Sequence, residues 1–151
     1  MLYTFFKASD LNLRLELDDK FIFLSGRKLP NGSVTEICLH NSHGPKLRIF
    51  SKMRDFSERL EIGSLCFERI KRYDNFNFKV NLDNNYPISI KKMVILIEGK
   101  KIESGLCLNY DKDKLIILPS DSPYALYVST DTFQSLNTSE YELITYSVEE
   151  L

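Results

Sequence analysis

Histidine is scarce in this sequence, with two residues in 151, and tryptophan is absent. Both histidines, His40 and His43, fall in one short segment, which leaves little material for a Ser-His-Asp catalytic site. A Gly-rich phosphate-binding loop and a Gly-x-Ser-x-Gly motif are also missing. The sequence therefore argues against a serine hydrolase, and it predicts no cofactor.

Cysteine is rare too, and its count is odd. Cys38, Cys66 and Cys107 cannot all pair within one chain, and their wide spacing does not form a disulfide framework. Each has large apolar neighbours on both sides, which favours packed or semi-buried thiols over reactive ones. A cytoplasmic, reducing location fits this pattern best.

Long apolar runs are missing as well. The longest, Met93 to Ile97, is much shorter than the roughly 20 residues that a membrane helix needs. Near the N-terminus, Lys7 and Asp10 interrupt the apolar residues before they reach the length of a signal-peptide core. No Pro/Gly/Ser-rich linker divides the chain. We therefore expect a single domain over residues 1–151, with no membrane span and no signal peptide.

Apolar residues alternate with polar residues in several segments. Leu11 to Leu17 and Phe76 to Leu82 show the strict period of two that predicts half-buried β-strands. Turn residues such as Asp18-Asp19, Gly99 and those at 111–113 separate apolar segments at hairpin distances. Further strands are predicted over Phe21 to Leu24, Glu36 to Leu39, Leu47 to Phe50, Ile88 to Ile90, Val94 to Ile97, Leu106 to Tyr110, Leu115 to Leu118, Tyr124 to Val128 and Tyr141 to Val148.

The segment 55–72 fits two structures. Its large apolar residues are spaced for one stripe of a helix, whereas Gly63 and Ser64 in the middle favour a strand, a bulge and a second strand. We favour the strands. The expected fold is mainly β, an antiparallel bent sheet, sandwich or partly open barrel of about eight to eleven strands. At most one or two short helices are expected, and Thr130 to Ser135 is a candidate.

Charge is distributed unevenly along the chain. Residues 1–110 contain 18 Lys and Arg against 13 Asp and Glu, whereas residues 111–151 contain 2 against 8. The nearly neutral total therefore combines a net charge of +5 with one of −6. Blocks of one sign on a folded surface steer charged partners, unless strands from the two parts pair and mix the charges.

One short motif contains three possible zinc ligands. Cys38-x-His40-x-x-His43 places them within six residues, but a closed zinc site needs a fourth ligand, and no second cluster occurs. We interpret the motif as the end of a strand entering a polar loop and assign no metal, while metal binding by these three residues stays open.

A second motif has the spacing of metal-dependent nucleases. Asp83 is followed fifteen residues later by Glu98-Gly99-Lys100, in which two carboxylates would bind Mg²⁺ and the lysine would position water. Gly99 at a hairpin tip argues against a rigid site. Asp111 and Asp113, interleaved with lysines, lack the spacing of a calcium loop and are interpreted as a solvated hairpin turn.

Basic residues form three groups, around 46–54, 69–76 and 91–101, and the first two contain aromatic residues. Such a surface can follow a phosphate backbone and stack bases. The residues that would contact nucleic acid are Arg48, Arg54, Arg69 and Tyr73. A pI of about 6.1 is far from the basic footprint of most nucleic-acid modules, so oligonucleotide binding is the alternative hypothesis.

The segment from Ile102 to Val128 contains a Ser-Gly step, two apolar strands and a Pro-Tyr step at 123–124. In these features it resembles the C-terminal part of small bacterial proteins encoded beside polymorphic toxins, some of them immunity proteins. The similarity covers under a fifth of the chain. It implies a cytoplasmic β-rich protein that neutralises a toxin by binding, with no catalytic residue to transfer.

The leading hypothesis is a non-enzymatic protein-binding module of the immunity type. Its acidic C-terminal region would bind a cationic toxin or effector, because charge complementarity raises the association rate and the specificity. The alternative is an oligonucleotide-binding β module, and the second alternative is a metal-dependent nuclease. The candidate partner-binding residues are Asp121, Asp131, Glu140, Glu142, Glu149 and Glu150.

Overall fold

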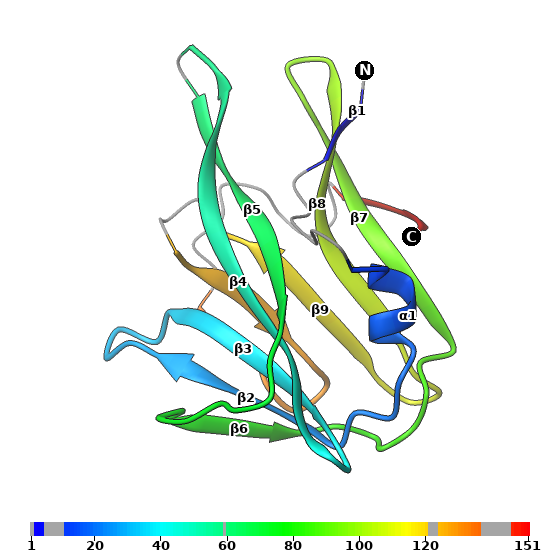
Figure 1. Ribbon diagram of the computed structural model, residues 1–151. Coiled ribbons are helices and arrows are strands. Elements are labelled where there is room, and N and C mark those ends of the chain that lie inside the picture. Colours follow the sequence, from blue (N-terminus) through cyan, green and yellow to red (C-terminus); the bar gives the residue numbers. More distant parts are fainter. Residues whose placement is uncertain (1, 5–10, 59, 121–123, 137–145) are drawn as a thin grey trace.

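The computed structural model describes residues 2–4, 11–58, 60–120, 124–136 and 146–151. Within them it contains one helix, α1 (Leu13–Leu17), and eleven strands of one sheet that does not close into a barrel (Figure 1). The strands are β1 (Leu2–Thr4), β2 (Phe23–Lys28), β3 (Val34–Asn41), β4 (Gly44–Ser57), β5 (Leu60–Arg69), β6 (Phe78–Asn81), β7 (Ser89–Ile97), β8 (Lys100–Asn109), β9 (Lys114–Pro119), β10 (Leu126–Ser129) and β11 (Ser147–Glu150).

The mainly β, antiparallel fold expected from the sequence is confirmed. The sheet order is β11-β7-β8-β9-β10-β3-β2-β6, and every pair on this path is antiparallel. Only β1 departs from this pattern among the described strands, because it pairs with β8 in parallel. The helix α1 has five residues, and none of the described helices is long and apolar enough to cross a membrane.

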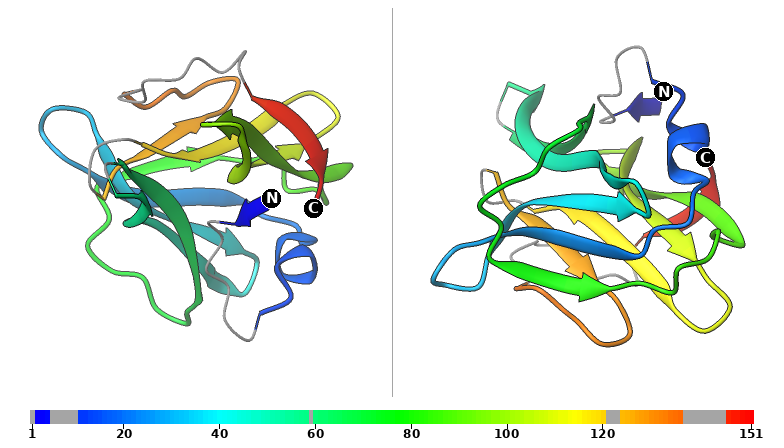
Figure 2. Two further views of the ribbon diagram at one scale, coloured as in Figure 1. Left: turned by 90° about the horizontal axis from the view of Figure 1, so that it is seen from above. Right: turned by 60° about the horizontal axis from the view of Figure 1, so that its bottom comes forward.

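The sheet divides at β3. Residues 36–41 of β3 pair with β4, whereas Val34 pairs with Leu126 of β10 on the same side of the strand. Two hairpins therefore rise toward the same end of the molecule (Figure 1): the β4–β5 arm (residues 44–69) and the β7–β8 arm (residues 89–109). In both views of Figure 2, α1 lies beside the C-terminal end of the chain at one side of the curved sheet.

The buried apolar side chains of the described residues form three clusters, two of which connect the branches of the sheet. The larger cluster packs the inward faces of both branches against Leu17 of α1. Its fully buried members include Phe21, Leu24, Ile37, Leu39, Leu47, Ile49, Leu65, Leu106, Leu108, Leu126 and Val128. The smaller cluster joins the two arms nearer their tips and consists of Phe56, Ile62, Ile95, Ile97 and Ile102.

The segment 55–72 forms strands, as favoured, but its bulge lies elsewhere. The β4–β5 register shifts between Asp55 and Ser57, and β5 runs through Gly63 and Ser64 without interruption. Glycine is required at position 63 by close packing, since a Cβ there would lie 2.7 Å from the Ser120 carbonyl oxygen. Gly99 forms the tip of the β7–β8 arm with a φ of 75°, as its position in the sequence predicts.

The prediction of a strand over Leu11 to Leu17 is wrong, because most of this segment forms α1. Asn12 caps the helix, and its side chain accepts a hydrogen bond from the Leu15 N–H at 3.3 Å. Leu13 and Leu17, four residues apart, share the face that packs on the main core, while Leu15 is 68% exposed. A strict alternation contains this four-residue spacing too, which is why it suggested a strand.

Two further predictions from the sequence also differ from the structure. Asp18-Asp19 links α1 to β2 and does not join two strands. Thr130 to Ser135 does not form a helix, because the Thr130 N–H bonds to the Phe133 carbonyl and the Ser135 N–H returns to Val128 of β10. The predicted strand over Tyr141 to Val148 lies outside the described residues up to position 145, and β11 begins at Ser147.

Replacing Leu17 and Leu15 separately tests the helix. Leu17→Ala should lower the free energy of unfolding by about 2–5 kcal/mol, because it removes a fully buried side chain. Leu15→Ala, the matched control, should change it by less than about 0.5 kcal/mol. Urea unfolding of both variants measures this difference. Equal losses would contradict α1, since a strand would place both leucines on one face.

Candidate functional site

The residues of the predicted nuclease motif lie far apart. Glu98 is exposed in the turn at the tip of the β7–β8 arm. Asp83 lies near Tyr110, just beyond the opposite end of β8. Burial raises the pKa of Tyr110, and the nearby charge of Asp83 raises it further. The ten residues of β8, at roughly 3.3 Å each, put about 30 Å between these ends. The predicted pairing of Asp83 with Glu98 and Lys100 around one metal ion is therefore wrong.

The Cys38-x-His40-x-x-His43 motif does not form a cluster. Cys38 and His40 are buried on the outer face of β3, whereas His43 is exposed in the β3–β4 turn. Burial raises the pKa of the Cys38 thiol to about 12, so the metal-binding thiolate is disfavoured. Among the described residues, no group of three or more His, Cys, Asp and Glu side chains is placed to bind a metal ion.

His40 pairs instead with a serine on the neighbouring strand, a contact that the sequence analysis missed. Ser25 Oγ lies 2.7 Å from His40 Nε2, and the imidazole stacks on Phe23 with a centroid distance of 4.1 Å. Ser25 is completely buried and His40 is 5% exposed, so a substrate cannot reach the hydroxyl. The pair joins β2 to β3 and is not a catalytic dyad. Local sequence does not reveal it, because it depends on strand register.

A buried carboxylate organises the same face of the sheet. Glu36 Oε2 accepts hydrogen bonds from Arg48 at 2.8 and 3.0 Å, and Glu36 Oε1 accepts one from the Tyr73 hydroxyl at 2.9 Å. Arg27 lies 3.1 Å from Oε1. Burial raises the pKa of Glu36, but the bonds from Arg48 and Tyr73 outweigh it, so the pKa is lowered. Burial and the bond to Glu36 raise the pKa of Tyr73.

The four residues assigned to nucleic acid are divided by this arrangement. Arg48 and Tyr73 lie on the outer face, where both bond to Glu36. Arg54 has the same parity as Arg48 along β4 and has no ion pair among the described residues. Arg69 follows Glu68, the ion-pair partner of Arg48, and therefore projects from the other face of β5. There it donates a hydrogen bond to the buried Glu16 of α1. Only Arg54 of the four is therefore uncommitted.

The acidic C-terminal strand pairs with basic strands of the same molecule. β11 lies antiparallel to β7, and Glu149 accepts a hydrogen bond from Lys101 at 2.7 Å. Glu150 lies 3.2 Å from Lys91 Nζ. The hydrogen bond from Lys101 lowers the pKa of Glu149. Part of the charge asymmetry along the sequence is therefore neutralised inside the fold, and Asp121, Glu140 and Glu142 lie outside the described residues.

Asp131 belongs to a different acidic group, at the end of the sheet opposite the arm tips. We call Asp83, Asp111, Asp113 and Asp131 the acidic end. They come from three segments: the residues after β6, the β8–β9 turn and the turn after β10. Two adjoining hollows of about 420 and 520 Å³ lie between these segments and share Lys112, Asp113 and Asp131.

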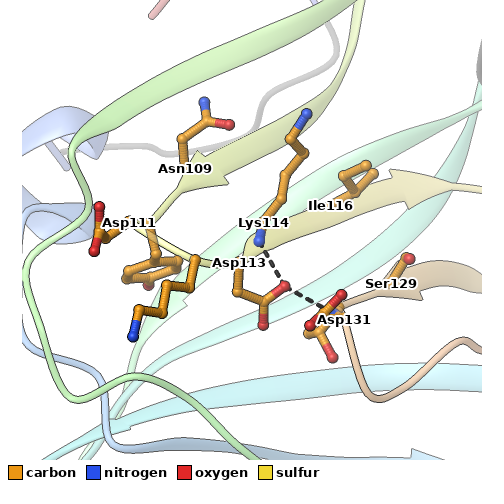
Figure 3. A pocket seen from close by; sticks show the side chains of 10 residues that line it. Asn109, Asp111, Asp113, Lys114, Ile116, Ser129 and Asp131 are labelled. Atoms are coloured by element: carbon orange, nitrogen blue, oxygen red, sulfur yellow. Dashed lines mark hydrogen bonds between the residues drawn. The ribbon is translucent and has the colours of Figure 1, made fainter.

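The geometry of the acidic end is shown in Figure 3. Asp113 Oδ1 accepts hydrogen bonds from the backbone N–H groups of Lys114 at 2.6 Å and Asp131 at 2.8 Å, which fixes the two turns beside each other. None of the ion pairs in the described part of the chain involves any of the four aspartates. Three lysines, Lys79, Lys112 and Lys114, line the same hollows.

Tyr110 adds a buried polar group to this end. It lines the smaller of the two hollows and is 7% exposed, and its hydroxyl has no hydrogen-bond partner among the described residues. A buried hydroxyl without a partner costs about 1–3 kcal/mol. Because burial and the charges of Asp83 and Asp113 raise its pKa, the phenol stays neutral and can both donate and accept.

Comparisons with protein-family models, with curated protein sequences and with solved structures found no match to this chain. Asp111 and Asp113 lie in the hairpin turn that the sequence predicts. Their proximity to Asp83 and Asp131 cannot be predicted from the sequence, because these residues are distant along the chain and meet only where β6 and β10 end and β9 begins.

The Ser25–His40 pair predicts a pH dependence of stability. Burial lowers the pKa of His40 from 6.5, and Lys79 lowers it further, so the unfolded chain takes up a proton before the folded protein does. The contribution of His40 to stability is therefore complete above pH 6.5 and declines as the pH falls toward its lower folded-state value.

Unfolding free energies between about pH 8 and pH 5 check this dependence. His40→Gln should flatten the decline, by at most about 1.4 kcal/mol per pH unit. His43→Gln, which removes the exposed histidine, serves as the control and should keep the wild-type slope. If both variants and the wild type share one slope, His40 does not carry the effect.

Proposed function

We propose that this protein is a non-enzymatic protein-binding module of the immunity type, which neutralises a cationic toxin or effector by direct binding. The observation that supports this proposal is the acidic end. Four aspartates from three segments surround two hollows without an ion pair to any described residue. A partner that inserts arginine or lysine side chains there would gain charge-assisted hydrogen bonds.

The mixed charges around the hollows favour a protein as the partner. The three lysines line the hollows together with the four carboxylates, so a uniform polyanion or a simple cation matches only part of the charges. A protein surface can present complementary charges of both signs, which raises specificity and the rate of association. The hollows also accommodate whole side chains, which suits anchor residues of a partner.

The other acidic candidates have a smaller role in this proposal. Glu149 and Glu150 already face lysines of β7 and β8, so a partner would have to compete with these contacts. Asp131 is the described member of the predicted set that lies at the acidic end. None of the three cysteines forms a disulfide, which agrees with the cytoplasmic location that we propose for this protein.

A pull-down with matched charge variants tests the proposal. The wild-type protein should recover one stoichiometric basic protein from nuclease-treated lysate of the source cells. With that protein purified, Asp83→Asn, Asp111→Asn and Asp131→Asn combined should raise the Kd at least about tenfold in about 150 mM salt. These three side chains are exposed and make no described hydrogen bond, so the variant should fold normally.

The control is the combined variant Glu149→Gln and Glu150→Gln, which removes acidic charge from the same C-terminal region. It should leave the Kd within about threefold of the wild-type value, because these residues form exposed ion pairs of small energy. A larger loss in the control than in the aspartate variant would place the partner at β11. Unchanged affinity in both would refute the acidic surface.

A further inference from the structure

A hollow on the β4–β5 arm is separate from the acidic end. Its volume is about 400 Å³, and its lining includes Phe50, Lys52 and Arg54 of β4 with Cys66 and Glu68 of β5. It shares no lining residue with the two hollows of the acidic end. Natural small-molecule sites begin at about 300 Å³, so it is large enough for a small ligand.

The charged groups of this hollow leave an excess of positive charge. Lys52 and Arg54 have no acidic partner within ion-pair distance among the described residues. Glu68, the one carboxylate in its lining, lies 3.7 Å from Arg48, which also bonds to Glu36. The two free cations stand two residues apart on β4, so both side chains project on the same side of the strand.

The other part of the lining is apolar and contains an aromatic ring. Phe50 is half-buried, and the Arg48 guanidinium lies over its ring at 4.1 Å from the centroid. Lys52 Nζ lies 5.7 Å from the same centroid. Cys66, which lies opposite Phe50 in the β4–β5 register, adds to the apolar side. The hollow thus combines a flat apolar surface with two cations that project from the same strand.

We propose that this hollow binds a nucleotide, with its phosphate on Lys52 and Arg54 and its base stacked beside Phe50 and Arg48. Arginine and lysine bind phosphate, and an aromatic ring next to a cation is the platform on which bases stack in single-strand binding proteins. A free mononucleotide and one nucleotide of a single strand present the same chemistry. Two cations and one ring are enough to contact one nucleotide unit, whereas a long strand would need a longer track of basic residues.

The probes are AMP, ribose 5-phosphate and an oligothymidine of about ten nucleotides, titrated into the full-length protein and followed by calorimetry. AMP should bind saturably and ribose 5-phosphate at least about fivefold more weakly, because it lacks a base. If the oligothymidine binds at least tenfold more tightly than AMP, the natural source is a single strand. If it binds no better than AMP, the source is a free nucleotide.

Two variants separate the phosphate from the base. Lys52→Gln with Arg54→Gln should weaken AMP binding by about tenfold or more, and binding should become less sensitive to salt. Phe50→Leu keeps the charges and should weaken AMP about tenfold while leaving ribose 5-phosphate unchanged. The control, Lys20→Gln with Lys71→Gln, removes two exposed lysines elsewhere and should leave the affinity for AMP unaltered.

Three results would overturn this inference. One is the lack of saturable binding of both AMP and the oligothymidine. Another is an equal loss in the Lys20/Lys71 control, which would indicate non-specific attraction. The third is a Phe50→Leu variant that unfolds at the wild-type urea midpoint and binds AMP as the wild type does. None of these measurements involves the acidic end, so their outcome does not affect the proposal of a protein partner.

Discussion

The arrangement of this protein depends on β3, because this strand has two edges and three neighbours. β2 occupies one edge along residues 36–40. The other edge is shared, with Val34 paired to β10 and residues 36–41 paired to β4. Since β4 and β10 cannot occupy the same stretch, they diverge, and the sheet divides into two branches. The large core lies where the branches meet, and the smaller cluster around Ile62 and Ile95 joins them again nearer the tips.

The division also leaves an outer face on β3 that contains polar side chains. Glu36 is 6% exposed there, and a buried carboxylate without partners would cost several kcal/mol. Arg27, Arg48 and Tyr73 remove this cost, and Tyr73 and Phe76 cover His40 from the same side. Residues that look suited to binding in the sequence are thereby used for stability. The charges available for function are those that remain after such contacts form.

The fold could largely be predicted from the sequence, whereas the sites could not. The strands follow from local residue patterns, but the sites depend on contacts between residues that are far apart in the sequence. Phe78–Asn81 is a strand within the predicted Phe76 to Leu82 segment, because one face packs on the core. Leu11 to Leu17 has the same alternation but contains the capping residue Asn12, and the cap prevails over the period of two. Asp83 meets Asp113 and Asp131 only through the order of strands in the sheet, which single-sequence patterns do not determine.

Register also determines whether a charge serves stability or binding. In the observed pairing, Glu149 lies opposite Lys92 and Glu150 opposite Lys91, so β11 neutralises the cations of β7 and β8. A slip of one residue would turn each side chain of β11 to the other face, and Lys91 and Lys101 would lose their partners, whereas Lys92 would keep its ion pair with Glu103. The β7–β8 arm would then carry a positive field of its own. The hollow around Lys52 and the acidic end differ from this region because Lys52, Arg54 and the four aspartates form no ion pair with any described residue.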